Sequence, residues 1–271
     1  MQKSIPLFYH IPKNSGTYVY HSLLTEVRKK YKNIDVRVIR VLDKQRTLAK
    51  IIVLGAIPPG PFSKAGRVRY DIDIENLTEQ ILNELSIVLV FIEASGFRCI
   101  NTSLKILFNF LSKYVLEKFA IFREPFLREQ SLYYYLKSDD SKHEFTHNKF
   151  RSHSFEEHIL SPQLQDSWLI RALLNMPRDK PVQPILEEHF DLAYDTLKSF
   201  KIYAIEDTQE LIKYILLKYF DVKQLDEITN LAYRNKSTYH QIKFNDLPTG
   251  TQKIFNQRKY WDKKLYEALL K

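Results

Sequence analysis

Short apolar segments alternate with stretches of helical periodicity, and this alternation limits the possible folds more than any other feature. The apolar segments have the length of buried β-strands: Ile5–Tyr9, Asp35–Val41, Ile51–Leu54, Ile87–Ile92, Phe119–Phe122 and Lys201–Ile205. Helical periodicity is clearest at Gly16–Lys30, Leu77–Leu85, Leu104–Leu116, Phe126–Leu136, Leu164–Asn175, Leu186–Phe200, Gln209–Tyr219 and Gly250–Leu270. We therefore expect an α/β fold with a central, mainly parallel sheet flanked by helices on both faces.

The size of the chain limits how many domains it can form. With 271 residues, 44% of them hydrophobic, it can bury one substantial core, so we expect a single domain over residues 1–271. The Pro- and Gly-containing stretch Ile57–Gly66 indicates a loop. The polar segment at residues 137–160 is expected to be an excursion on the acceptor side of a binding cleft, or else a solvated connector.

The chain carries an excess of positive charge. Its 41 Lys and Arg residues against 32 Asp and Glu give a formal charge of +9, which attracts nucleic acid, a phosphorylated cofactor or an acidic polysaccharide. No apolar run is long enough to span a membrane and no signal-peptide pattern is present, so we expect a soluble chain without stable membrane insertion. Cys99 is the only cysteine, which excludes an intrachain disulfide. We expect its side chain to be buried as a small hydrophobic group.

Residues 7–17 combine the end of a strand with a turn of small residues, and a helical stretch follows. In such a turn the backbone N–H groups converge at the helix N-terminus and bind phosphate together with a lysine, here Lys13. The G-x-x-x-x-G-K-[ST] spacing of a Walker A loop is absent, which counts against an ATPase or kinase. The alternative is an ordinary turn in which Ser15 or Thr17 caps the helix and the lysine is exposed.

The amino-acid sequence of this turn resembles a motif of a known protein family. His10-Ile11-Pro12-Lys13-x-x-Gly16-Thr17 resembles the 5′-phosphosulfate loop of carbohydrate sulfotransferases related to the heparan sulfate 2-O- and 6-O-sulfotransferases, whose usual form is H-I-P-K-T-G-G-T. Two small, hydrogen-bonding residues replace the family's threonine and first glycine. The resemblance implies that the donor, 3′-phosphoadenosine 5′-phosphosulfate (PAPS), is bound by Lys13, Asn14, Ser15, Gly16, Thr17 and Tyr18.

A second match begins at Arg123. The sequence from Arg123-Glu124-Pro125 to the tyrosine run contains every mark of the family pattern R-[DE]-P-x-x-R-x-x-S-x-Y-Y. Pro125 suits the first turn of a helix, so we expect Arg123 at the end of a strand and Ser131 about two turns into the helix. The resemblance implies that Arg123 and Ser131 bind the donor's 3′-phosphate. The alternative is an ordinary ion pair and a surface serine.

Three further segments resemble the family more loosely. Leu164–Leu169 is similar to its N-x-Q-T-x-x-L helix and Ile205–Thr208 to its late G-L-x-E segment. Residues 235–238 resemble a donor-contacting loop, which implies that Lys236 and Ser237 bind the donor. The resemblance covers nearly the whole chain and implies a P-loop NTPase-like sheet, with PAPS as donor and adenosine 3′,5′-bisphosphate (PAP) as product.

Sulfuryl transfer needs in-line positioning, neutralisation of the leaving group and a base for the attacking hydroxyl. Lys13 is the candidate for stabilising the departing 5′-phosphate. In the family the base is usually His or Glu, often in an S/T-G-H segment before the R-[DE]-P strand, and residues 91–97 here contain no histidine. Glu93 is therefore the leading candidate for the base and His10 the second. The alternative for Glu93 is a structural carboxylate paired with Arg98.

Four histidines lie close together in the sequence. The spacings of His143, His147, His153 and His158 match no standard zinc pattern, and sulfuryl transfer needs no metal, so we expect none. His147 and Arg151 are instead the candidates for contacting the acceptor.

The sequence thus predicts a PAPS-dependent O-sulfotransferase acting on a hydroxyl of a saccharide or glycan, and the basic charge suits an acidic acceptor. The competing interpretation is a sulfotransferase fold without activity, or a basic module that binds nucleic acid or another polyanion. We find no recognised nucleic-acid motif, so we expect no nucleic-acid partner. The expected location is the cytoplasm for a full-length bacterial chain and the Golgi lumen for a trimmed eukaryotic catalytic domain.

Overall fold

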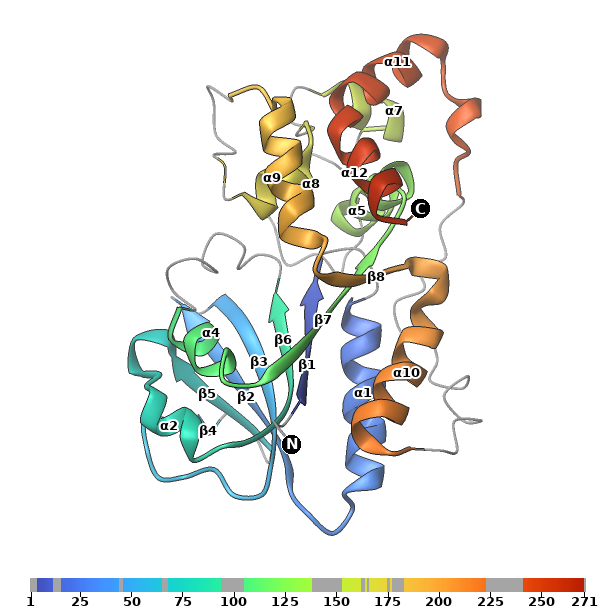
Figure 1. The fold of residues 1–271 in the computed structure, drawn as a ribbon. Helices are drawn as coiled ribbons and strands as arrows, with labels where there is room; N and C mark the ends of the chain where they lie inside the picture. Colours follow the sequence, from blue (N-terminus) through green and yellow to red (C-terminus); the bar gives the residue numbers. More distant parts are fainter. Residues whose placement is uncertain are drawn as a thin grey trace. The chain divides into compact units, whose positions relative to one another are not determined.

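The computed structural model describes residues 4–11, 16–43, 46–64, 68–93, 105–137, 153–161, 164, 166–174, 176, 183–222 and 241–270. At Asp43, Arg46 and Glu93 only the backbone is described. The chain divides into two compact units (Figure 1): Met1–Phe122 with Ser199–Arg234, called the sheet unit, and Arg123–Lys198 with Asn235–Lys271, called the helical unit. The single domain expected over residues 1–271 stays a prediction.

The sheet unit contains an eight-stranded mixed sheet with flanking helices, in the order β4-β5-β2-β3-β6-β1-β7-β8. Its described elements are β1 (Ser4–His10), α1 (Gly16–Lys30), β2 (Val36–Asp43), β3 (Arg46–Leu54), β4 (Ser63–Lys64), β5 (Arg69–Asp73), η1 (Ile74–Asn76), α2 (Glu79–Asn83), β6 (Ser86–Glu93), α4 (Lys105–Leu111), β7 (Val115–Phe122), β8 (Phe200–Ala204), η3 (Ile205–Asp207) and α10 (Thr208–Phe220). Strands β6, β1, β7 and β8 pair in parallel, as β2 and β5 do. The predicted α/β class is therefore confirmed.

The sheet is less parallel than the sequence suggested, because β3 is antiparallel to both of its neighbours and β4 is antiparallel to β5. Only residues 44 and 45 separate β2 from β3. So short a link joins antiparallel strands, since a parallel pair needs a crossover of about a dozen residues or more. The connection from β6 to β7 includes α4, which is long enough for the parallel arrangement of the central strands.

Helices α1 and α10 share one apolar cluster with the central strands. α1 buries Val19, Leu23 and Val27 at helical spacing, and they belong to the same cluster as Phe8 of β1. Five consecutive residues of β1 are buried, as expected for a strand covered on both faces. Burial of each such large side chain contributes roughly 1.5–3 kcal/mol, so the position of β1 and α1 is set by apolar packing.

The helical unit is built around aromatic side chains. Its described elements are α5 (Pro125–Lys137), α7 (Phe155–Leu160), α8 (Trp168–Leu173), α9 (Glu187–Leu197), η5 (Phe244–Asp246), α11 (Thr249–Arg258) and α12 (Tyr260–Leu270). The ring centroid of Phe126 lies 5.6 Å from that of Phe155 and 5.4 Å from that of Phe255. These edge-to-face contacts join α5, α7 and α11 in one core.

Element boundaries show where tertiary contacts override local preference. The helix predicted over Gly16–Lys30 is confirmed. The long helix predicted over Gly250–Leu270 is interrupted at Lys259, whose side chain is buried in polar contacts. The helix predicted to extend to Leu116 ends at Leu111, because Val115 begins β7 and pairs with β1; ladder hydrogen bonds decide the conformation of such short segments.

Among the described residues, the sequence patterns missed the strands β4 and β5 and the helix α7, as well as the short 3₁₀ helices η1 and η5. β4 lies inside the loop predicted over residues 57–66, and β5 follows it with Ile72 as its only buried residue, so its apolar signal was too weak. α7 lies inside the excursion predicted at residues 137–160 and begins with a capping box between Ser154 and Glu157.

In the described part of the chain, none of the helices combines the length and apolar character needed to cross a membrane.

Candidate functional site

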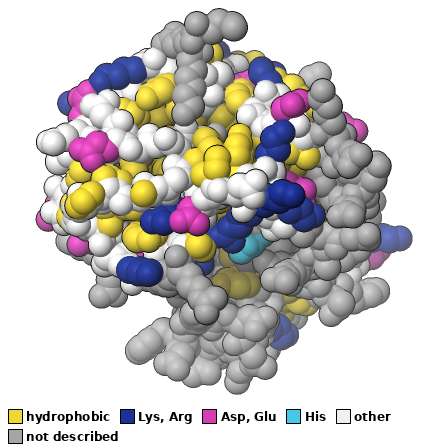
Figure 2. All heavy atoms as spheres, turned by 90° about the horizontal axis from the view of Figure 1, so that it is seen from below, with side chains coloured by type: hydrophobic (Ala, Val, Ile, Leu, Met, Phe, Trp, Pro, Cys, Tyr) yellow, Lys and Arg dark blue, Asp and Glu magenta, His cyan; other side chains and the backbone are white. Residues whose placement is uncertain are grey.

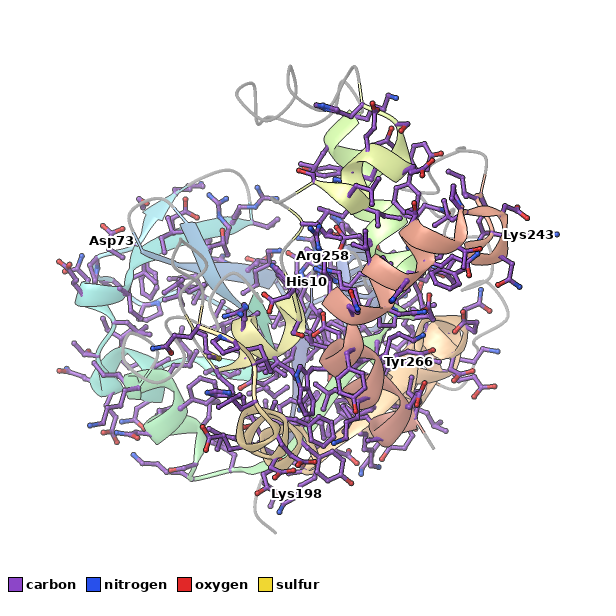
Figure 3. The ribbon with its side chains drawn as sticks, turned by 90° about the horizontal axis from the view of Figure 1, so that it is seen from above. His10, Asp73, Lys198, Lys243, Arg258 and Tyr266 are labelled. Atoms are coloured by element: carbon purple, nitrogen blue, oxygen red, sulfur yellow. The ribbon has the colours of Figure 1, made fainter. Side chains whose placement is uncertain are left out.

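The ends of β1 and β6 lie side by side at one edge of the sheet. His10 ends β1 and Glu93 ends β6, and the Cα atoms of these residues are register partners; His10 is labelled in Figure 3. In open α/β sheets, ligands bind at the carboxyl ends of parallel strands. The two candidates for the catalytic base are therefore neighbours across one strand pair, although the side chain of Glu93 lies outside the described atoms.

The imidazole of His10 lies against the first residue of α1. A Cβ atom added to Gly16 would stand 1.8 Å from Cδ2 and 2.5 Å from Nε2 of His10, much closer than van der Waals contact. Only glycine fits here while the ring keeps its position. The ring therefore borders the N-terminus of a 15-residue helix whose dipole favours an anion, and residues 16–19 include no acidic side chain.

The other predicted donor contacts of this segment have different outcomes. Gly16 is buried, Thr17 is exposed and Tyr18 is half-buried. Three residues lie outside the described part of the chain: Lys13, Asn14 and Ser15. The contacts of all six residues with a donor stay predictions.

The second predicted segment begins as expected, with Pro125 as the first residue of α5. The Oε2 atom of Glu124 accepts a hydrogen bond from the backbone N–H of Leu127 at 2.9 Å, and its carbonyl accepts from that of Arg128 at 2.9 Å. Glu124 is thus the N-cap of α5. Glu124 therefore has a structural role. Its carboxylate accepts from an otherwise unpaired amide of the first turn, and its negative charge interacts favourably with the helix dipole.

Arg123 directly follows β7. Its Nε atom is buried and has no hydrogen-bond partner among the residues that the structure describes, while the side chain as a whole is half-buried. A buried donor without a partner costs about 1–3 kcal/mol, so an anion that accepts from it would be bound favourably. Ser131 is half-buried and lies two turns into α5. Both residues belong to the helical unit.

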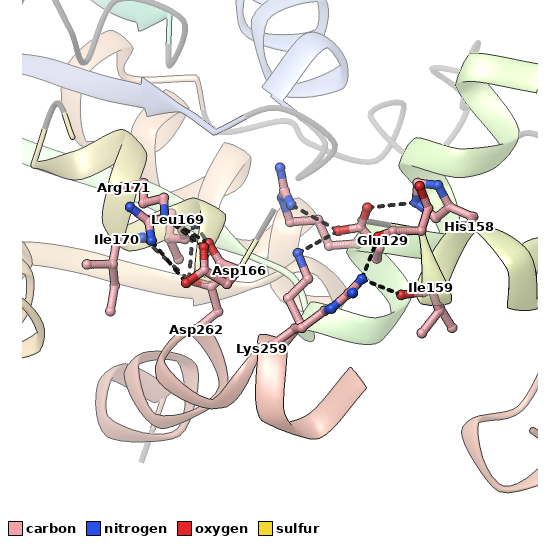
Figure 4. A network of polar contacts seen from close by, with 12 residues as sticks. Glu129, His158, Ile159, Asp166, Leu169, Ile170, Arg171, Lys259 and Asp262 are labelled. Atoms are coloured by element: carbon pink, nitrogen blue, oxygen red, sulfur yellow. Dashed lines mark hydrogen bonds and ion pairs between the residues drawn. The ribbon is translucent and has the colours of Figure 1, made fainter. Parts of the chain in front are cut away.

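A buried network of charged side chains holds α5 in the helical unit (Figure 4). The Oε2 atom of Glu129 lies 3.0 Å from Nζ of Lys259, and Oε1 lies 3.0 Å from Nε2 of His158. The guanidinium of Arg128 lies 3.9 Å from the ring centroid of Trp168 and its Nη1 lies 3.9 Å from Oε2 of Glu129. The two cations Arg128 and Lys259 and the two carboxylates Glu129 and Asp262 are all buried, so the opposite charges must compensate one another within the network.

The protonation of this network follows from burial and charge. Burial alone raises the pKa of the Glu129 carboxyl, but the charge of Lys259 and the hydrogen bond with His158 outweigh burial and lower the pKa. Burial lowers the pKa of the Arg128 guanidinium, and burial raises the pKa of Asp262. Glu129 is therefore ionised at neutral pH and holds Lys259 as an ion pair.

The residues around the interruption between α11 and α12 each hold another helix. Arg258, labelled in Figure 3, donates from Nη1 to the carbonyls of Ile159 and Ser161 at 2.8 and 2.5 Å, at the end of α7. The carboxylate of Asp262 accepts from the backbone N–H of Leu169 at 3.1 Å, at the start of α8. Sequence reasoning missed these residues, although charges within a periodic helical stretch were a usable signal.

A second carboxylate with several donors lies on β7 in the sheet unit. Glu117 accepts from Nζ of Lys218 and from the hydroxyl of Tyr214, both at 2.8 Å, and also contacts Lys201 and Tyr219. Burial alone raises the pKa of Glu117, but these hydrogen bonds outweigh it and lower the pKa to about 2. The side chains of both lysines are 47% exposed, so this cluster, unlike that of Glu129, is partly solvated.

The remaining predicted segments are only partly described. The segment Leu164–Leu169 includes the start of α8, preceded by Ser167 in the left-handed conformation with φ of 43°. The segment Ile205–Thr208 forms η3 and the start of α10, and the hydroxyl of Thr208 donates to the carbonyl of Ile205 at 2.6 Å. The candidate donor and acceptor contacts outside the described residues are Lys236, Ser237, His147 and Arg151.

Figure 2 shows one face of the molecule, on which Lys and Arg side chains gather beside a histidine and also lie singly among apolar side chains. Among the described residues, no three His, Cys, Asp or Glu side chains lie together in a group that could hold a metal ion.

Comparison with known protein families, with curated proteins and with solved structures found no match to this chain.

Proposed function

We propose that the chain is a PAPS-dependent O-sulfotransferase with a P-loop NTPase-like sheet, acting on a hydroxyl of a saccharide or glycan. The 5′ end of the donor is assigned to the turn between β1 and α1, and the 3′-phosphate to Arg123 and Ser131. Both segments follow the C-terminal ends of parallel strands, β1 and β7. This is the place at which such sheets carry their ligands.

The observation that carries the proposal is the guanidinium of Arg123. Its buried Nε atom lacks a hydrogen-bond partner among the described residues, and Ser131 of the same motif remains half-buried on α5. A phosphate supplies the acceptor oxygens that such a group needs. The residues present therefore fit a phosphorylated donor, and the basic net charge of +9 favours it and an acidic acceptor.

The roles of the chain's own residues follow from the needs of the reaction. When bound, PAPS supplies an activated sulfuryl group on a phosphate leaving group. Lys13 is assigned to neutralise charge on the 5′-phosphate, next to the N-terminus of α1. Glu93 is assigned to accept the proton of the acceptor hydroxyl, with His10 as the second candidate. His10 also fills the space over Gly16, so part of its role is structural.

Nucleotide binding tests the donor assignment. PAP should stabilise the wild-type chain against thermal unfolding, by about 2.7 kcal/mol when its concentration is a hundred times its Kd. Arg123→Ala should remove most of this shift. Arg28→Ala changes an exposed arginine of α1 and serves as the matched charge control, which should keep the shift. A wild-type chain that PAP does not stabilise would sink the assignment.

Transfer of labelled sulfate from PAPS to a glycan panel tests the activity itself. Glu93→Gln should lower the rate by about 10²-fold or more if Glu93 is the base, because base catalysis contributes about that much. His10→Gln should then have the smaller effect. A chain that binds PAP but transfers no sulfate to any acceptor would instead favour a sulfotransferase fold that has lost its activity.

A further inference from the structure

The helix that carries Ser131 is held from several sides by polar contacts within the helical unit. Arg128 lies over the ring of Trp168 in α8, 3.9 Å from its centroid. Gln130 donates from Nε2 to the carbonyl of Ile242 at 3.0 Å. The hydroxyl of Tyr133 donates to another backbone carbonyl at 2.6 Å. These contacts join α5 to three segments that are distant in the sequence, so α5 has little freedom to rotate.

Among the residues of α5, Glu129 makes the contacts that are hardest to replace, because it is an ionised carboxylate with only 4% of its side chain exposed. Lys259 and His158 contact its two oxygens, one each, at 3.0 Å. A buried charge must keep its partners, since losing one leaves an uncompensated charge in a medium of low polarity. The energy of the network therefore depends steeply on the orientation of Glu129, and so on the rotation of α5.

Helix geometry places this contact opposite Ser131. At roughly 100° per residue, the side chains of residues 129 and 131 point about 160° apart around the helix axis. The buried residues 125, 126, 128, 129, 130 and 133 cover one side of α5, and Leu127, Ser131 and Tyr134 on the other side are only half-buried. Glu129 thus fixes the side of α5 that faces away from Ser131.

We propose that Glu129, held by Lys259 and His158, is a positioning residue that sets the rotation of α5 and thereby the binding of a 3′-phosphate. Arg123 precedes the helix, whereas Ser131 turns with it. Any rotation of α5 therefore changes the separation of the two groups assigned to one phosphate. This inference rests on the proposed function, and it adds three residues that touch no ligand to the determinants of donor selectivity.

The test is the preference for a 3′-phosphate, measured by calorimetry as the ratio of the Kd values of adenosine 5′-phosphate and PAP. Glu129→Gln keeps the size of the side chain but removes its charge. We expect the ratio to fall about tenfold, the equivalent of one charged hydrogen bond, with the affinity for adenosine 5′-phosphate nearly unchanged. If Glu129 contributed only to stability, the substitution would weaken the binding of both nucleotides equally and leave the ratio of their Kd values unchanged.

Glu117→Gln is the matched control. It removes the same charge from a carboxylate with several donors, but Glu117 pairs with Pro6 in the first half of β7 and lies outside both candidate segments. It should lower stability and keep the ratio. A similar fall of the ratio in both variants would overturn the inference, because the effect would then follow destabilisation.

A double variant separates positioning from folding. Glu129→Gln with Lys259→Met removes the two charges of this ion pair, so stability should recover relative to Lys259→Met alone. The ratio should stay low because the fixed contact is gone. A double variant or Glu129→Gln that keeps the wild-type ratio would overturn the inference and leave the proposed function intact. A wild-type chain without preference for PAP would overturn both.

Discussion

The two segments assigned to the donor's phosphates are built in opposite ways. The turn before α1 is supported by apolar packing: Val19 and Leu23 anchor the helix, and the ring of His10 covers Gly16. The segment before α5 is supported by buried charge, with Glu129 and Lys259 at its centre. The first site depends on Gly16 having no side chain. The second depends on charged side chains that must keep their partners.

This difference predicts different sensitivities. A turn supported by apolar packing and a close backbone approach should keep its folded structure when pH or charge changes, but not when a methyl group is added. A site held by buried charges should tolerate small changes of volume but not the loss of one charge. Trp168 and Trp261 are the chain's two tryptophans, and both belong to the helical unit. Tryptophan fluorescence therefore reports on that unit, and far-UV circular dichroism reports on the whole chain.

The largest effect is expected for Lys259→Ala. The substitution leaves the buried Glu129 without its nearest cation, which should cost about 3–5 kcal/mol. Urea denaturation followed by far-UV circular dichroism, which reports on both units, measures the loss in this variant and in its control. Lys201→Ala is the control, because Glu117 keeps its other donors and the lysine is half-exposed, so the cost should stay below about 1 kcal/mol. Equal losses would contradict the distinction between the buried and the partly solvated carboxylate.

Gly16→Ala should have the next largest effect. The new Cβ would overlap the ring of His10, and overpacking of this kind costs about 2 kcal/mol. Urea denaturation followed by circular dichroism measures it. In the double variant Gly16→Ala, His10→Ala the overlap is absent, so the added methyl group should cost less there than in the presence of His10. If Gly16→Ala is as stable as the wild type, the ring does not hold its position.

Acid should separate wild type from Glu117→Gln in a defined window. Because the pKa of folded Glu117, about 2, lies below its usual value near 4.5, ionisation stabilises the folded chain above pH 4.5, and this contribution is lost as the pH falls toward 2. Glu117→Gln should therefore cost on the order of 1–2 kcal/mol at pH 7, and much less near pH 2. Urea denaturation at several pH values tests this. A gap independent of pH would contradict the ion pairs.

The smallest effect is expected for Ser131→Ala. Loss of one hydrogen bond from a neutral hydroxyl to the phosphate should weaken the binding of PAP about fivefold, or by about 1 kcal/mol. Stability should change by less than about 0.5 kcal/mol, because Ser131 is on the less buried side of α5. Calorimetry with PAP and thermal unfolding measure the two quantities. An unchanged affinity for PAP would remove Ser131 from the proposed site.

Local sequence was sufficient where short-range geometry decides the structure. The apolar stripe of α1 predicted its full extent, Gly16–Lys30, and Pro125 marked the first turn of α5. The antiparallel β3 and the short β4 were not foreseen, since pairing depends on neighbours that are distant in the sequence or on turns without a strong signal. The motif residues 13–15 and 236–237 lie outside the described part of the chain, so their roles remain predictions from the sequence.

By itself, the sequence determined the α/β class and the two strand-to-helix junctions, because periodicity and proline act over a few residues. It could not determine why Gly16 is required, since the ring that excludes a side chain comes from the end of β1. It also could not show that Glu129 meets Lys259, a partner 130 residues away. Only tertiary structure brings such groups together, because burial and charge compensation are properties of the folded chain.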